Sequence, residues 1–261
     1  EYSLNSYLNR VLKTTSRKDY IVAIDTDSLY VCLDDIVSKF NPENPIDFLD
    51  KVANDMLEPE LAKSYDSLFK ILGGVSNRMV MKREAIADRA IWTAKKRYIL
   101  NVHDNEGVRY KKPKLKIMGI EAIKSSTPEP CREALKALFK VIIQKDERET
   151  QLAIEKFKNH FKTLPPDEIA FPRGVTKVRE YRQHGKKPYK KGTPMHVRAA
   201  LLYNSQVDNL ALGKKYQHIK NGDKIKFIYL RKSNSIKENV IGFIDYLPEE
   251  FKLHQYIDYD T

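Results

Sequence analysis

Two carboxylates, Asp25 and Asp27, stand in the short run Asp-Thr-Asp-Ser between two apolar segments. These segments, residues 20–24 and 29–33, are rich in β-branched and aromatic residues, which predicts a β-hairpin with the run at its turn. Side chains alternate along a strand, so both carboxylates should lie on one side of the tip. Like charges held this close repel unless a cation or hydrogen bonds offset them, and such oxygen ligands suit Mg²⁺. A polar, solvated turn would explain an isolated Asp-x-Asp equally well.

Basic residues form the second group that could carry a function. Residues 76–120 hold 12 basic and 4 acidic side chains, and residues 171–200 hold 9 and 1, in a chain of 261 residues with net charge +12. Such blocks are typical of a polyanion-binding surface, whereas a merely solubilising surface usually mixes both signs. We therefore favour nucleic acid as the partner.

Four segments resemble, in their order along the chain, the motifs of family B DNA polymerases, and most closely those of T-even-type bacteriophages. The Asp-Thr-Asp-Ser run is similar to the third palm motif, and residues 95–98 (Lys-Lys-Arg-Tyr) resemble the basic motif that touches the primer–template duplex. Residues 114–128 look like the palm-to-thumb junction, and residues 194–204 like a thumb segment. A single run is a weak signal, but the ordered set covers the chain from about residue 4 to its end.

The resemblance implies a catalytic role for the hairpin carboxylates. Asp27 would be the ligand shared by two Mg²⁺ ions, and Asp25 a nearby carboxylate that coordinates less directly. In the family, one ion activates the primer 3′-hydroxyl and the other holds the triphosphate, as in other two-metal sites. The chain departs from the family at Ile24, where a Gly usually stands. Packing into the sheet would account for that β-branched side chain.

The same resemblance assigns the basic residues to DNA. The lysines of the Lys-Lys-Arg-Tyr motif would reach the minor groove, where acceptors are similar for every base pair. Lys95 and Lys96 precede a predicted strand, and they would fall on opposite faces if it is regular. Later cations would contact phosphates, which position the duplex without reading its sequence. The DNA-contacting residues expected on this basis are Lys95, Lys96, Arg97, Tyr98, Lys114, Lys116, Lys124, His196 and Arg198. A buried, satisfied histidine remains an equally good interpretation of His196.

Periodicity predicts an α+β fold. Residues 1–120 should form an antiparallel sheet with helices on one face, and residues 121–261 a mostly helical part with a small β subdomain. The resemblance identifies the first part with the palm and the second with the thumb. In the first part we expect a helix at 3–12, a long helix capped by Asp47 that packs under the sheet, and strands at 78–83, 97–102 and 108–117.

In the second part, two helices should precede residue 165, and residues 171–193 should form a long basic loop. His196 and Arg198 would lie two apart on a strand, facing one way. Residues 216–219 and 225–230 should pair as a small hairpin around Asn221-Gly222-Asp223.

Composition narrows the setting of the protein. Cys32 and Cys131 provide neither a disulfide framework nor a zinc pattern, which favours a reducing interior, the cytoplasm of a bacterial host if a phage encodes the protein. No apolar run approaches the roughly 20 residues of a membrane span, so no membrane partner is expected. The first residues lack the features of a signal peptide.

The leading hypothesis is the palm and thumb part of a DNA-directed DNA polymerase that binds primer–template DNA and deoxynucleoside triphosphates. The other palm aspartate, the fingers and the exonuclease of the family are missing here. We therefore expect the chain to be inactive alone and to need the amino-terminal part of the polymerase as a partner. The family also binds a sliding clamp through a short hydrophobic tail, which is not visible here. The alternatives are a non-catalytic duplex-binding module and, less favoured because no further acidic or histidine cluster completes a site, a small metal-dependent nuclease.

Overall fold

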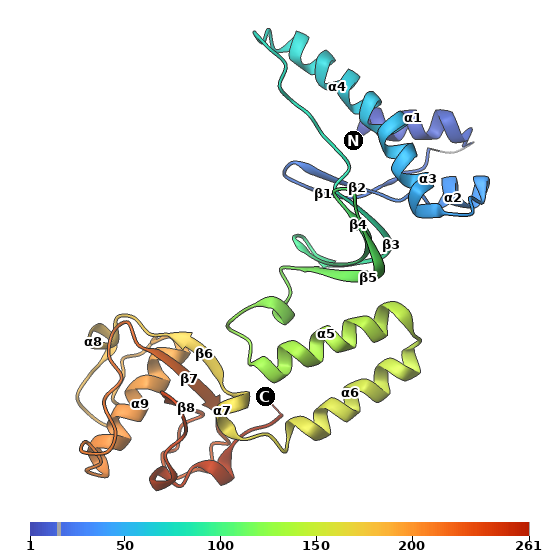
Figure 1. Cartoon of the computed structure of the whole chain (residues 1–261). Helices are drawn as coiled ribbons and strands as arrows, with labels where there is room; N and C mark the ends of the chain where they lie inside the picture. The colour runs from blue at the N-terminus through green and yellow to red at the C-terminus, as the bar shows by residue number, and fades with distance from the viewer. Residues whose placement is uncertain (15–16, 261) are drawn as a thin grey trace. The chain divides into compact units, whose positions relative to one another are not determined.

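The computed structural model describes residues 1–14 and 17–260, which form two compact units, Glu1–Met118 and Gly119–Thr261 (Figure 1). Both units combine helices with antiparallel strands, which confirms the predicted α+β class. Throughout the described ranges, every helix is too short or too polar to cross a bilayer. The two units are considered separately below.

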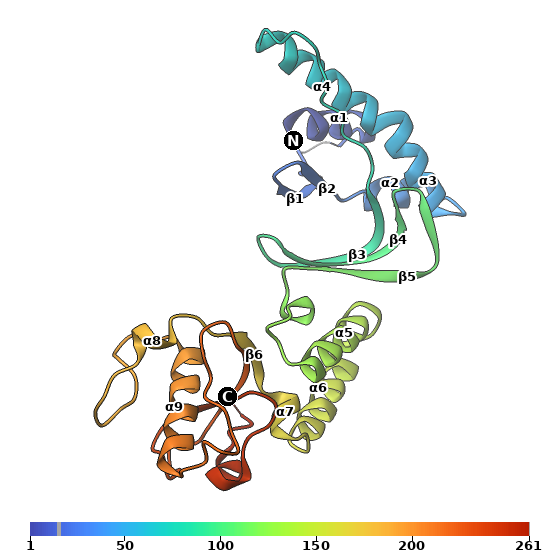
Figure 2. The ribbon, with the colours of Figure 1, turned by 60° about the vertical axis from the view of Figure 1, so that its left-hand side comes forward.

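The first unit contains helices, a two-stranded hairpin and a three-stranded antiparallel sheet in the order β3-β4-β5. Figure 2 shows β3, β4 and β5 running side by side as long curved strands. The elements of this unit are α1 (Tyr2–Leu12), β1 (Ile21–Asp25), β2 (Ser28–Val31), α2 (Asp34–Phe40), α3 (Pro45–Val52), a π-helical turn (Ala53–Leu57), α4 (Glu58–Ile71), β3 (Ala85–Ala94), β4 (Arg97–Asn105) and β5 (Val108–Met118).

One apolar core joins α1, the hairpin and the next helices. Leu4 and Leu8 of α1 are almost fully buried and share this core with Tyr20, Ile21 and Ile36. The helical spacing of leucines in the predicted 3–12 helix is therefore confirmed, since these positions form its buried face. This core holds the β1–β2 hairpin, which as an isolated two-stranded ribbon would be only marginally stable.

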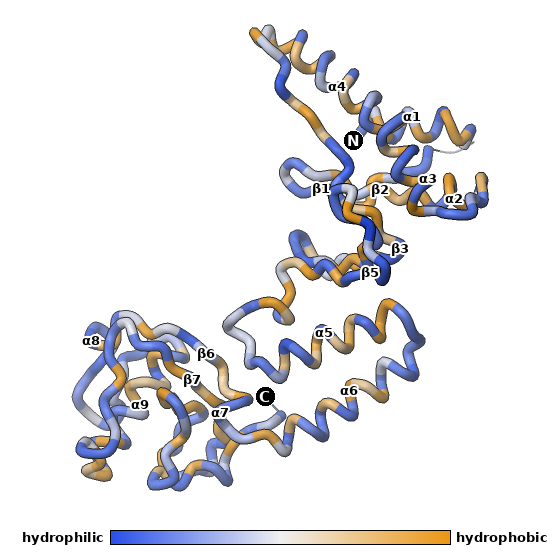
Figure 3. The backbone as a smooth tube through the Cα atoms, viewed as in Figure 1, coloured by the Kyte–Doolittle hydropathy of each residue, from blue (hydrophilic) through white to orange (hydrophobic). Residues whose placement is uncertain are grey.

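The long helix differs from the prediction in its cap, its continuity and its packing. Asn44, not Asp47, caps it, because the Asn44 side chain accepts hydrogen bonds from the backbone of Ile46 and Asp47. A π-helical turn interrupts it just before Pro59, whose missing N–H cannot continue the regular α pattern. The α4 portion has no fully buried residue: Leu61 near its start still packs against the core, whereas Ile71 at its end is 81% exposed. Orange apolar segments persist along α4 in Figure 3.

The strand predicted at 78–83 is wrong, because this segment pairs with no strand among the described residues and β3 begins only at Ala85. Its end is anchored through Arg83: the backbone N–H of Arg83 donates to Glu58 Oε1 at 2.8 Å, and its guanidinium binds two carboxylates. The predicted β4–β5 hairpin is confirmed, with Asn105 opposite Val108 and the turn between them. The positive φ of Glu106 and Gly107 is the conformation that such two-residue turns require.

The second unit packs one long buried helix against a three-stranded antiparallel sheet in the order β6-β7-β8, beside a pair of helices. Its elements are a 3-10 turn (Glu121–Ile123), α5 (Glu129–Gln144), α6 (Glu147–Phe161), α7 (Pro166–Ile169), β6 (Phe171–Gly174), α8 (Val178–Tyr181), α9 (Met195–Asn209), β7 (Lys224–Tyr229), β8 (Val240–Phe243) and two further 3-10 turns (Glu249–Phe251 and His254–Tyr256).

The core of this unit forms around α9, whose side chains are buried on several sides. A Cβ added at Gly242 of β8 would lie 3.0 Å from the backbone carbon of Ala199, so glycine is what permits this close approach of helix and strand. The strand expected around His196 is therefore a helix. A helix buried on several sides lacks the one-sided periodicity that would have identified it.

Two other expectations for this unit are also wrong. Residues 171–193 are not one loop, because β6 and α8 lie within them and Phe171 stacks on Phe227 of β7 at a centroid distance of 5.4 Å. Residues 216–219 are not a strand. The strand partners of β7 are β6 and β8. The turn residues Gly222 and Asp223 instead form backbone hydrogen bonds with Val175.

Candidate functional site

The carboxylate run forms the tip of the β1–β2 hairpin, as predicted. Asp25 pairs with Ser28 across the strands, leaving Thr26 and Asp27 as the two turn residues. Thr26 has φ 52°, the positive value that a two-residue hairpin turn needs at its first position. The Ser28 hydroxyl donates to the Asp25 carbonyl at 3.0 Å, and the Thr26 hydroxyl donates to the Asp25 carboxylate at 3.2 Å. Local chemistry therefore fixes this tip.

The two carboxylates are accessible. The Asp25 side chain is 28% exposed, and Asp27 is exposed and reaches a hollow of about 520 Å³ between the hairpin and β3. Ile24 is 46% exposed, so packing into the sheet does not account for it. Within residues 1–14 and 17–260 no three acidic, histidine or cysteine residues gather around one point. The tip therefore carries two accessible carboxylates, and no further acidic, histidine or cysteine cluster of the described residues adjoins them.

A second hairpin tip reaches the first. Lys95 and Lys96 are the turn between β3 and β4, where Ala94 pairs with Arg97, and Lys96 has φ 62°. They therefore precede a strand, as expected, but because they form a turn they do not alternate between the two faces of a regular strand. The Lys96 ammonium lies 3.3 Å from the Asp25 carboxylate, although its side chain remains 62% exposed. The structure thus brings together the acidic and the basic motif.

Aromatic side chains pack the two hairpins against each other. The Tyr30 ring lies edge-on to Trp92 and to Tyr98, with centroid distances of 5.3 Å in both cases. Tyr98 is buried, at 7% exposure, so its ring belongs to this cluster. Burial, followed by its hydrogen bond with Tyr30, raises the pKa of Tyr98, and the nearby Asp25 charge acts in the same direction. Tyr98 is therefore a neutral packing residue that supports the position of the tips.

The later cations are spread over both units. In the first unit, Lys114 lies over the Tyr110 ring at 4.2 Å, and Lys116 is ion-paired with Glu84. In the second, Lys124 pairs with Glu121 at 3.0 Å. Arg97 is half-buried at the start of β4. Lys114 is exposed, and within the described residues it forms no ion pair with an acidic side chain, unlike Lys116 and Lys124.

His196 and Arg198 lie in the first turns of α9, where residues two apart do not share a face. The Arg198 guanidinium donates to Asn239 Oδ1 at 2.5 Å and stacks on the Tyr189 ring at 5.6 Å, so it is held within the fold. Burial, and after it the charge of Arg173, lower the pKa of His196. His196 is half-buried on α9, and both interpretations of this residue, a DNA contact and a packed histidine, stay predictions.

Sequence reasoning missed Arg83, which connects three parts of the first unit. Its guanidinium bonds Asp50 of α3 at 2.6 Å and also the buried Asp104 of β4. Arg109 of β5 contacts the same Asp104 at 3.3 Å. In the sequence, Arg83 is the last residue of the segment predicted as a strand at 78–83, and nothing in the local pattern distinguishes it from the other basic residues of 76–120.

Comparison with known proteins agrees with these features. The chain is 32% identical over 276 residues to the DNA-directed DNA polymerase of Enterobacteria phage T4, covering 99% of this chain and 30% of that protein. It is 34% identical over 257 residues to the DNA-directed DNA polymerase of Escherichia phage RB69, covering 93% of this chain and 28% of that protein. The chain is a relative of the T-even-type family B DNA polymerases.

This relationship confirms the resemblance inferred from the four motifs. The chain spans less than a third of the length of these curated relatives. No family model matches it.

Proposed function

We propose that this chain supplies palm and thumb elements to a DNA polymerase that adds nucleotides to a primer 3′-hydroxyl. The observation that carries the proposal is the meeting of two hairpin tips, one with Asp25 and Asp27 and the other with Lys95 and Lys96. A carboxylate proposed to lie beside a divalent cation, Asp25, and a lysine proposed to bind DNA, Lys96, are thereby only 3.3 Å apart. In this proposal, the first unit acts as palm and the second as thumb.

The hairpin would hold Mg²⁺ through Asp27, with Asp25 beside it. When bound, two such ions stabilise the attacking and leaving oxygens of an in-line displacement. Mg²⁺ is usually bound by one or two carboxylates plus substrate phosphates, and the exposed tip offers two. Lys96 would offset the negative charge of Asp25 until a divalent cation takes over this role and the lysine contacts the primer end.

The partners follow from the same proposal. Primer–template DNA would contact the lysine tip, and deoxynucleoside triphosphates would enter beside the carboxylates. An amino-terminal polymerase segment would provide the remaining carboxylate and the fingers, so the chain alone would be inactive. A sliding clamp would be a further partner of the complete enzyme. Two free, half-buried thiols, Cys32 and Cys131, fit a reducing cytoplasm such as that of a bacterial host.

Primer extension tests this function. The chain alone should extend no primer, and mixing it with the amino-terminal segment of the same polymerase should restore extension. Asp27→Ala should then lower the rate by more than about 100-fold, since even losing an indirect partner of a metal ligand typically costs 10–100-fold. Asp55→Ala is the matched control, because Asp55 is an exposed aspartate on the π-helical turn. Near-normal extension by the Asp27→Ala complex would contradict the proposal.

A non-catalytic duplex-binding module is the second candidate, favoured by the Lys96–Asp25 ion pair, which already offsets one of the carboxylates. The two candidates differ in the effect of Asp27→Ala on DNA affinity in Mg²⁺. If the lysine tip binds DNA without a metal, this variant should leave affinity unchanged, and reconstitution should give no extension.

A further inference from the structure

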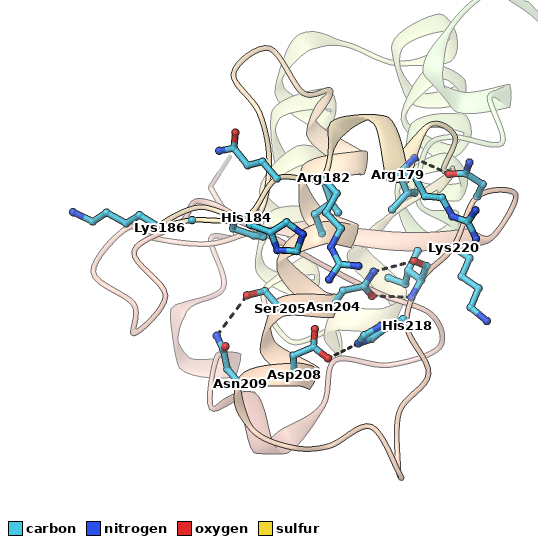
Figure 4. Close-up of a pocket in the computed structure, with 17 residues that line it drawn as sticks. Arg179, Arg182, His184, Lys186, Asn204, Ser205, Asp208, Asn209, His218 and Lys220 are labelled. Atoms are coloured by element: carbon cyan, nitrogen blue, oxygen red, sulfur yellow. Dashed lines mark hydrogen bonds and ion pairs between the residues drawn. The ribbon is translucent and has the colours of Figure 1, made fainter.

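A basic hollow in the second unit has no part in the function proposed above. It is formed by residues 178–188 of the segment around α8, residues 201–209 of α9 and residues 218–221, and it encloses about 800 Å³. Figure 4 shows Arg182 and His184 above the polar side chains of α9, which are Asn204, Ser205, Asp208 and Asn209. Lys186 and Lys220 extend outward at opposite ends of the hollow. This volume is in the range of small-molecule sites, roughly 300–1,000 Å³.

The walls of the hollow are fixed by side-chain hydrogen bonds. Asn204 of α9 makes two bonds to the backbone of Ile219, at 2.7 and 2.9 Å. Asn221 accepts a hydrogen bond from the backbone N–H of Val178 at 2.6 Å. These amides join three separate segments of the chain around one concavity. The hollow is therefore a built feature of this unit and not a gap between loops.

The charges around the hollow are unbalanced. Four cations, Arg179, Arg182, Lys186 and Lys220, line it, and in the described ranges none of them forms an ion pair with an acid. The acid in the lining is Asp208, which His218 already engages at 2.7 Å. Cations gathered in a concavity focus a positive potential and attract anions.

The shape and lining select the kind of anion. A hollow of about 800 Å³ has the size of a small-molecule site and cannot enclose a DNA duplex. The lining residues include no Phe, Tyr or Trp, so the stacking platform typical of base recognition is missing from it. Arginines bind phosphoryl oxygens in a bidentate manner, and Ser205 and Asn209 add neutral polar groups beside them.

We propose that the basic hollow binds the phosphoryl groups of a single nucleotide unit. That unit is supplied either by a free nucleotide or by a single DNA strand, and both present the same phosphate chemistry. Arg179 and Arg182 hold the phosphates, while Lys186 and Lys220 raise the local anion concentration. The site uses none of the residues of the two hairpin tips, so it does not rest on the catalytic assignment.

Isothermal titration calorimetry on the full chain tests this inference, with dATP and the oligonucleotide (dT)8 as separate probes. EDTA is present throughout, so that metal-dependent nucleotide binding at the hairpin carboxylates does not contribute. The double variant Arg179→Gln/Arg182→Gln should weaken binding of the accepted probe by about tenfold or more, as expected for loss of charge-assisted contacts. Binding of dATP would identify a free nucleotide as the ligand, and binding of (dT)8 alone would identify a strand.

Two further variants make the test decisive. Ser205→Asp introduces a negative charge into the hollow and should also abolish binding. Lys232→Gln removes an exposed lysine outside the lining and should leave binding unchanged. Thermal unfolding of each variant checks that the unit remains folded. The inference is overturned if neither probe binds the unmodified chain, or if the arginine variant binds as tightly as Lys232→Gln. Primer extension does not enter this test, so failure of the proposed polymerase function would be seen separately.

Discussion

At the residue scale, the contact between Lys96 and Asp25 connects the two predicted motifs. Both side chains are partly exposed, and exposed ion pairs contribute only about 0–1 kcal/mol to stability. The pair can therefore separate at little cost when a phosphate or a metal ion competes for its members. This property suits the role proposed for Lys96, in which the lysine would exchange Asp25 for a DNA phosphate.

We predict that Lys96→Ala weakens binding to primer–template DNA without unfolding the first unit. One lost phosphate contact should reduce the slope of log affinity against log salt by about 0.9, while the unfolding free energy should change by no more than roughly 0.5 kcal/mol. Fluorescence anisotropy over a salt series measures the slope. Lys112→Ala, at another exposed lysine of the same unit, is the control. Equal losses in both variants would assign the effect to net charge and not to this tip.

At the element scale, the hairpin tips depend on how β4 is fixed. Tyr30 packs against Trp92 and Tyr98 on one side, and Arg83 ties the buried Asp104 of β4 to Asp50 of α3. A buried carboxylate that loses its cation is strongly unfavourable, whereas exposed pairs matter little. Arg83 is thus a positioning residue for the sheet that carries Lys96.

We predict that Arg83→Met destabilises the first unit by about 3 kcal/mol, the cost of leaving a buried carboxylate without its partner. Trp92 is the one tryptophan of the chain and lies in the first unit, so its fluorescence during urea unfolding reports on this unit. Lys63→Ala is the control, since the Lys63 side chain is 75% exposed and its contact with Glu60 is 3.6 Å long. A loss below 1 kcal/mol for Arg83→Met would show that Arg109 alone compensates Asp104.

At the scale of the whole molecule, the two units should respond differently to acid. Burial and the charge of Arg173 lower the pKa of His196 in the folded second unit, whereas an unfolded histidine titrates near 6.5. Below about pH 6.5 the unfolded state therefore binds a proton that the folded state does not. Stability of the second unit should fall as the pH is lowered through 6.5 toward the depressed folded value.

We predict that His196→Gln reduces this acid sensitivity. Thermal unfolding followed by circular dichroism at pH 7.5 and 5.5 measures the whole chain, and Trp92 fluorescence provides an internal reference for the first unit. The drop in melting temperature between the two pH values should be smaller in the variant, while the Trp92 transition should be unaffected. An unchanged drop would attribute the acid sensitivity to other titratable groups of the chain.

The sequence by itself determined the features that depend on neighbouring residues. β-branched flanks and turn residues predicted the β1–β2 and β4–β5 hairpins, and the leucine spacing predicted α1, because strand alternation, turn conformation and helical periodicity are all short-range properties. The ordered motifs identified the family, and comparison with the phage polymerases confirmed it.

Only the tertiary structure decided the features that depend on distant residues. His196 and Arg198 lie on the helix α9 and not on a strand. Because α9 is buried on several sides, its sequence lacks the one-sided apolar pattern that identifies a helix. Residues 78–83 alternate like a strand but have no partner strand, and Arg83 instead finds its carboxylates on α3 and β4. The contact of Lys96 with Asp25 likewise joins two turns far apart in the chain. Side-chain contacts of this kind depend on packing across the whole unit, and no local spacing encodes them.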